Sequence, residues 1–261
     1  LAMTVGALIL MLAVLGTRAR RDLPFSLAWP WATLAWVIVQ GVFGKYTVTL
    51  KLYPAIVTLH LFGGLLLLAL LVVQAERYAR RPIALAGAVR TLLGVALALL
   101  VVQVLLGAWV STNYAVLACR GFPQCNGQWW PESMDAAAGF TLLRHLGRAG
   151  EGGFLPAEAL VAIHWAHRVF ALVVVATLAA LAARLWREPT TRRVAQALLL
   201  VTGLQVATGA ANVVLQWPLV AALLHTAGAA ALVMLLVSLQ ARATPAPSPV
   251  RAARAAQAAP Q

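Results

Sequence analysis

The feature that most constrains this chain is a spacing of four residues that occurs twice, 165 positions apart. Each stretch has a glutamine, a glycine four positions later, a histidine sixteen positions after that glycine, and a second glycine three positions after the histidine. The residues are Gln40, Gly44, His60 and Gly63, and then Gln205, Gly209, His225 and Gly228. Each stretch crosses two long apolar segments, and its histidine lies inside the second. Such a duplication predicts a pseudo-symmetric membrane protein with a ligand in each half.

The composition places these segments in a lipid bilayer. Hydrophobic residues make up 62% of the chain, charged residues make up 10%, and the mean hydropathy is +0.86. A helix needs about 20 mostly apolar residues to cross a bilayer. This rule predicts an all-α, polytopic membrane protein with seven spans, at residues 2–17, 29–48, 53–75, 89–112, 157–183, 194–215 and 217–240.

The net charge of +13 indicates how the spans are oriented. Fourteen of the 20 basic residues fall on one side, in loops near residues 18–21, 77–90 and 184–193 and in the C-terminal tail. The positive-inside rule makes that side cytoplasmic and places the loop of residues 113–156 outside. We therefore expect the lipid bilayer, and no nucleic acid, as a partner. Residues 241–261, rich in Ala, Pro and Arg, are expected to form a disordered cytoplasmic tail.

Both cysteines, Cys119 and Cys125, lie in the external loop. An oxidising exterior favours a disulfide, and the Gly and Pro residues between them allow the two thiols to approach. Two free thiols are one alternative, and a metal site built from this pair is another.

Three histidines are expected at similar depth in the membrane. His60 follows Pro54 by six residues and His225 follows Pro218 by seven, which puts both about 10 Å below the outer boundary. His167 lies within one helical turn of that depth. Two histidines at one depth on different helices suit a haem with two axial imidazoles, because neutral imidazole binds iron and apolar walls suit the macrocycle.

The remaining polar groups have more than one interpretation. Arg168, directly after His167, is placed to meet a haem propionate. His164 competes with His167 as a ligand, or lines the haem pocket. For each histidine, the alternative is a hydrogen bond to a neighbouring helix without any cofactor. The glycines are interpreted as positions of close helix packing, and Gln40 and Gln205 as bonding across helices or to a loop.

The duplication also predicts how the chain is divided. The second and third spans repeat the sixth and seventh, so the first should repeat the fifth. Aligning the first and fifth spans by their terminal arginines puts the counterpart of His167 before Leu1. We therefore expect an N-terminally truncated form of a protein with two four-helix bundle halves. Residues 1–85 would be the incomplete N-terminal half and residues 86–240 the C-terminal half.

Four motifs in this order resemble the haem A synthase family. They are QGVFGKYTVTLKLYPAIVTLHLFGG, LGAWVSTNYAVLACRGFPQCNGQWWP, AIHWAHR and LQVATGAANVVLQWPLVAALLHTAGA, and the resemblance covers about residues 1–240. It implies an oxidoreductase of the bacterial inner membrane. Such an enzyme oxidises the C8 methyl group of haem O to a formyl group, which gives haem A for haem–copper oxidases.

The resemblance also implies roles for individual residues. His167 and His225 match the axial ligands of haem b in the C-terminal half. His60 matches a catalytic-site histidine that binds the substrate haem, whose partner histidine and a glutamate would precede Leu1. Cys119 and Cys125 match the external cysteine pair. The implied partners are haem O synthase, cytochrome oxidase assembly factors and a second copy of the chain.

Two other functions would use the same residues. An electron-transfer membrane cytochrome b with quinone as its partner would hold two haems of unchanged chemistry. A transporter with histidine proton relays would hold no haem, but it needs a polar pathway across the bilayer, and polar groups gather only toward the outer half.

The sequence has no nucleophile triad, phosphate loop or dinucleotide fingerprint, so the difficult oxidation has to come from a cofactor.

Overall fold

The computed structural model describes residues 2–149 and 153–245, and seven long helices make up most of them. They are α1 (Ala2–Arg18), α2 (Ala28–Thr49), α3 (Pro54–Ala79), α4 (Gly87–Thr112), α6 (Ala157–Trp186), α7 (Arg192–Val214) and α8 (Leu219–Arg242). Each end lies within four residues of the predicted span. The all-α class and the polytopic membrane fold are confirmed.

Five of these helices, α3, α4, α6, α7 and α8, are long and apolar enough to cross a membrane on their own. Helix α1 is apolar but has only 17 residues. Helix α2 has 22 residues, and polar groups such as Gln40 and Lys45 lower its hydropathy. Helix α2 packs antiparallel to α3. Two hydrogen bonds link these helices: Gln74 Nε2 donates to Thr33 Oγ1 at 2.7 Å, and Trp36 Nε1 donates to the Gly63 carbonyl at 2.8 Å.

Proline marks the start of three helices at one end of the bundle. Pro54 is the first residue of α3, and Pro156 and Pro218 are the N-caps of α6 and α8. Proline suits these positions because its missing N–H would have no partner in the first helical turn. Pro54 and Pro218, from which the depths of His60 and His225 are counted, therefore lie at helix starts.

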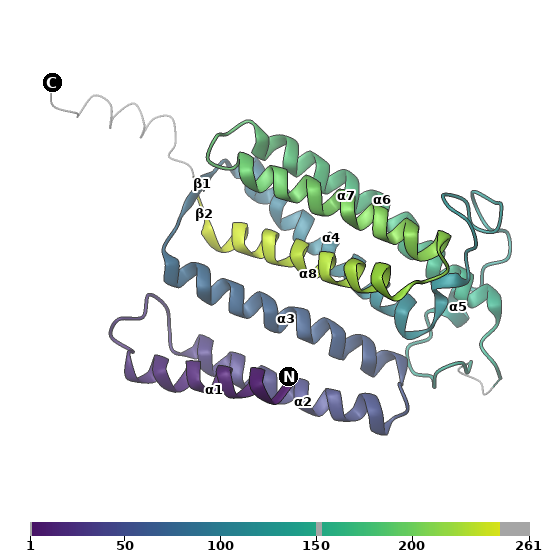
Figure 1. Ribbon diagram of the computed structural model, residues 1–261, viewed down its shortest axis with the longest axis horizontal. Helices are drawn as coiled ribbons and strands as arrows, with labels where there is room; N and C mark the ends of the chain where they lie inside the picture. Colours follow the sequence, from purple (N-terminus) through teal and green to yellow (C-terminus); the bar gives the residue numbers. More distant parts are fainter. Residues whose placement is uncertain (1, 150–152, 246–261) are drawn as a thin grey trace.

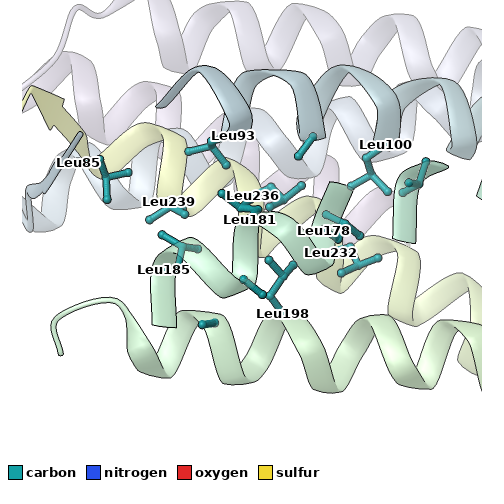
Figure 2. Packing of buried hydrophobic residues seen from close by; sticks show 14 of the residues in the cluster. Leu85, Leu93, Leu100, Leu178, Leu181, Leu185, Leu198, Leu232, Leu236 and Leu239 are labelled. Carbon is teal, nitrogen blue, oxygen red and sulfur yellow. The ribbon is translucent and has the colours of Figure 1, made fainter. Parts of the chain in front are cut away.

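The larger apolar core of the described residues lies between α4, α6, α7 and α8 (Figure 2). Its leucines come from all four helices: Leu93, Leu100, Leu178, Leu181, Leu185, Leu198, Leu232, Leu236 and Leu239. Lipid tails are as apolar as leucine, so burial from water contributes little to this association. Close van der Waals packing holds the four helices together.

A short parallel strand pair lies at the arginine-rich end of the bundle, opposite the long 113–156 loop (Figure 1). Strand β1 (Ile83–Leu85) pairs with β2 (Ala243–Pro245), with Ile83 opposite Ala243. Because α8 continues to Arg242 and β2 follows directly, the start predicted for the disordered tail, Ala241, is too early. Residues 246–261 of that predicted tail lie outside the described residues.

The long loop contains the 3₁₀ turn η1 (Ala115–Leu117) and the short helix α5 (Ala136–Gly139). Trp109 Nε1 donates to the Gly139 carbonyl at 2.9 Å, and Arg144 Nη2 donates to Asn113 Oδ1 at 2.6 Å. Burial lowers the pKa of the Arg144 guanidinium from its ordinary value. These contacts fix the loop to the outer end of α4.

The 165-residue repeat is present in the backbone as well as in the sequence. The α2–α3 turn has Lys51 and Leu52 at φ 51° and 60°, and the α7–α8 turn has Gln216 and Trp217 at φ 58° and 63°. Equivalent N–H to carbonyl bonds close both turns. They are Leu50–Tyr46, Lys51–Val48 and Leu52–Thr47 in the first, and Leu215–Ala211, Gln216–Val213 and Trp217–Asn212 in the second. The two helical hairpins are therefore one unit used twice.

Replacing Leu181 with Ala should destabilise the bundle, because this side chain is fully buried between the four helices. The cavity should cost about 2–4 kcal/mol, measured as a lower midpoint of unfolding in mixed micelles. The control is Leu172→Ala on the same helix, where the side chain is 71% exposed toward lipid. Equal losses in the two variants would contradict this core.

Candidate functional site

Each hairpin packs its histidine against the first glycine of the repeated spacing. A β-carbon built on Gly44 of α2 would lie 3.3 Å from Cε1 of His60 on α3. A β-carbon on Gly209 of α7 would lie 3.3 Å from Cε1 of His225 on α8. These distances are shorter than an ordinary carbon–carbon contact, so any larger residue at these two positions would require the imidazole to move by a few tenths of an ångström.

In each hairpin, the glutamine and the second glycine of the repeated spacing also pack on each other. The side-chain amide of Gln40 occupies the space beside Gly63, and that of Gln205 occupies the space beside Gly228. In the second hairpin, Gln205 Nε2 also donates to the backbone carbonyl of His225 at 2.9 Å. The bonding across helices expected for Gln205 is confirmed. The repeated spacing thus encodes two reciprocal contacts, histidine on glycine and glutamine on glycine.

A third unit of this kind surrounds His167 and was missed in the sequence. Helix α4 has the same glutamine-to-glycine spacing, Gln103 and Gly107, and a β-carbon on Gly107 would lie 3.0 Å from Cε1 of His167 on α6. Gln103 Nε2 donates to the His167 carbonyl at 3.2 Å and lies 3.1 Å from its Nδ1. The glutamine-to-glycine spacing of α4 is visible in the sequence. The full four-residue spacing is absent, because Phe170 occupies the position of the second glycine.

The hydrogen bonds of Thr208 favour one tautomer of His225. Thr208 Oγ1 donates to the Leu204 carbonyl at 2.8 Å and lies 3.1 Å from Nδ1 of His225. Because the hydroxyl proton is used on Leu204, the Thr208 oxygen accepts the proton of Nδ1. Nε2 of His225 then keeps its lone pair, which is the form of imidazole that binds a metal.

His60 and His225 occupy the same position in their helices, and their depth in the membrane stays a prediction. His60 is the seventh residue of α3 and His225 the seventh residue of α8, counted from Pro54 and Leu219. His167 lies further along its helix, α6, than these two histidines do along theirs. His145, by contrast, is exposed in the long loop and stacks edge-on against Tyr53.

Arg168 connects α6 to the cysteine loop. Its Nη1 donates to the carbonyls of Gly121 and Gln124, both at 3.1 Å, and its Nη2 donates to the carbonyl of Cys119 at 2.9 Å. Its Nε donates to Nε2 of His164 at 3.1 Å. The contact of Arg168 with a haem propionate stays a prediction, and the structure gives this guanidinium a second task.

His164 is buried between Arg168 and the disulfide loop, where one ring nitrogen can accept a hydrogen bond from their N–H groups. Besides the contact with Arg168, its Nδ1 lies 3.4 Å from the backbone nitrogen of Cys119. The side chain is only 4% exposed. Of the two interpretations left open, this arrangement favours a residue that supports the pocket wall.

The disulfide between Cys119 and Cys125 is present, and both residues are fully buried against Val161 of α6. Trp129 and Trp130, a few residues on, are each 67% exposed, as expected for anchors at a membrane interface. The disulfide therefore closes the loop segment whose carbonyls bind Arg168, next to His167.

The described residues contain no group of three or more His, Cys, Asp and Glu that could enclose a metal ion. Single imidazoles on separate helices are the potential ligands. This donor set suits a metal that a macrocycle already holds and that needs only axial ligands.

Comparisons with known proteins agree on one family. The family model of COX15-CtaA, described as cytochrome oxidase assembly protein, matches residues 1–237. The chain is 37% identical to the "Heme A synthase" of Shewanella oneidensis over 207 residues, which is 78% of this chain and 62% of that protein. It is 30% identical to the "Heme A synthase" of Shouchella clausii, over 53% of this chain and 48% of that protein. A third relative of the same name, from Paracoccus denitrificans, is 36% identical over 52% of this chain and 33% of that protein. The chain thus spans less than two thirds of each relative.

Replacing Arg168 with Gln should loosen the cysteine loop, because several hydrogen bonds of roughly 1 kcal/mol each are lost. We expect chymotrypsin to cut the unreduced protein within residues 119–130 about tenfold faster or more, since cleavage follows local opening. The control is Arg148→Gln, where the arginine of the same long loop stacks on Phe154. Wild-type cleavage rates for the Arg168 variant would contradict this role.

Proposed function

Since the chain belongs to the COX15-CtaA family of cytochrome oxidase assembly proteins, we propose that it acts in the synthesis of haem A. The reaction would convert haem O to haem A by oxidising the C8 methyl group of the porphyrin to a formyl group. The relatives named "Heme A synthase" support this assignment.

The observation that carries the proposal is the recurrence of one imidazole environment in both hairpins. His60 and His225 have the same position in their helices and the same glycine contact. A reaction on a haem that is assisted by a second haem needs two sites of similar construction. An internal duplication supplies them.

The residues around His225 fit a haem. The Nδ1 proton is held by Thr208, so Nε2 is available as a ligand without any proton transfer. Gly209 and Gly107 let the imidazoles of His225 and His167 lie directly against the neighbouring helix. The surrounding helices are apolar, as a macrocycle requires. Bound haem would supply the redox chemistry that no side chain of this protein supplies.

In the proposed arrangement, His167 and His225 hold haem b in the C-terminal half, residues 86–240. His60 holds the substrate haem in the N-terminal half, residues 1–85. The glycine contacts would bring each imidazole close to the neighbouring helix. Arg168 keeps the start of α6 fixed to the disulfide loop, and one of its N–H groups remains for a propionate.

The charge distribution supports an orientation for this arrangement. The arginine-rich loops and the β1–β2 pair would face the cytoplasm of a bacterial cell. The disulfide loop would face the oxidising exterior. The histidines would then lie in the outer half of the bilayer.

Replacing His167 or His225 with Ala should lower bound haem b to about a tenth of the wild-type amount or less, because an axial ligand is lost. Replacing His60 should leave haem b in place and remove the substrate haem. The measurement is the optical spectrum and haem content of the purified protein, with His145→Ala as the control. Retained low-spin haem b in both the His167 and His225 variants would defeat the ligand assignment.

A further inference from the structure

The two hairpins differ at a position next to the histidine pocket. With an offset of 165, Phe43 is the counterpart of Thr208, and each directly precedes the glycine that packs on the imidazole. The contacts of the glutamines and histidines with glycine and the turn bonds are equivalent in the two hairpins, although only Gln205 also donates to the carbonyl of its histidine. This exchange of a hydroxyl for a phenyl ring therefore stands out against an otherwise repeated framework.

The exchange changes the hydrogen bonding of the histidine. In the second hairpin, Thr208 accepts the Nδ1 proton of His225, and its own proton is fixed on the Leu204 carbonyl. In the first hairpin, Phe43 offers no acceptor. Within residues 2–149 and 153–245, Nδ1 of His60 is buried and has no hydrogen-bond partner. His225 thus has one tautomer and one ring orientation, whereas neither is fixed by a hydrogen bond in His60.

A hydrogen bond of this kind strengthens a metal ligand. An acceptor on the distal ring nitrogen fixes the tautomer, raises the basicity of the ligating nitrogen and orients the ring, and its loss typically costs 10–100-fold in affinity. A resident cofactor gains from such a bond. A substrate site has to release its haem after each turnover, and a ligand without the bond suits that demand.

We propose that the residue at position 43 or 208 determines how long haem stays in each hairpin. Thr208 is a positioning residue that makes His225 a durable ligand, and Phe43 leaves His60 an exchangeable one. The inference rests on the proposed function, because it assigns the resident haem to the second hairpin and the substrate haem to the first.

The test exchanges the two side chains and measures haem loss. In Thr208→Val, the shape is kept and the hydroxyl is removed, so transfer of haem b to an excess of a haem-scavenging apoprotein should be about 10–100-fold faster. The electron paramagnetic resonance signal of the low-spin haem should also shift, because the ligand is less basic. Thr208→Ser keeps a hydroxyl and should restore the wild-type rate and signal.

The controls use neighbouring positions. Thr226 follows His225 and bonds only to the Ala222 carbonyl in its own helix, so Thr226→Val should leave haem b retention unchanged. In the first hairpin, Phe43→Thr should slow the release of haem O or haem A about tenfold. Val42→Thr, at the 46%-exposed neighbouring position, should not.

The outcomes separate this inference from the proposed function. Wild-type haem loss and an unchanged resonance signal in Thr208→Val would overturn the inference, even if haem O and haem A are present. Faster loss in Thr208→Val that serine does not restore would make the residue structural and would overturn it as well. A wild-type protein that holds haem B alone would instead contradict the proposed function, while the Thr208 comparison could still be made on that haem.

Discussion

The packing of an imidazole ring against a glycine of the neighbouring helix is the contact on which the rest of this structure depends. It occurs three times, at Gly44, Gly107 and Gly209, and each time a glutamine one turn earlier packs on the opposing helix. The helices must approach closely enough for a ring to touch a glycine, which fixes their spacing. The same approach places each ring between two helices, and in the second hairpin the Thr208 contact with Nδ1 is added to it.

One arginine connects the helix that carries His167 to the disulfide loop. Arg168 binds three carbonyls of the disulfide loop and the buried ring of His164, and it follows His167 directly in α6. Charged groups are costly inside a bilayer unless they are satisfied, and these four bonds satisfy the guanidinium near the outer boundary. The disulfide between Cys119 and Cys125 keeps the carbonyls in place. The disulfide loop and helix α6, which carries a proposed haem ligand, therefore form one structural unit.

The sequence predicted the helices well because membrane spans follow from length and hydropathy, and the hairpin repeat because four residues kept their register. It did not predict the role of Gln103, because the long loop between α4 and α6 changes the spacing to His167 and Phe170 replaces the second glycine. Nor did it predict the Arg168 bonds to Cys119, Gly121 and Gln124, because a loop conformation decides which carbonyls converge. The bond between Thr208 and His225 depends on side-chain direction across two helices, which spacing alone does not specify.

The most direct test of the account is the identity of the haem in the purified protein, by extraction and chromatography beside the optical spectrum. The account predicts haem B together with haem O or haem A, because one hairpin holds a resident cofactor and the other a substrate or product. Haem B alone would contradict the synthase assignment and favour an electron-transfer cytochrome. The absence of haem from the purified protein would contradict the ligand role of His60, His167 and His225 altogether.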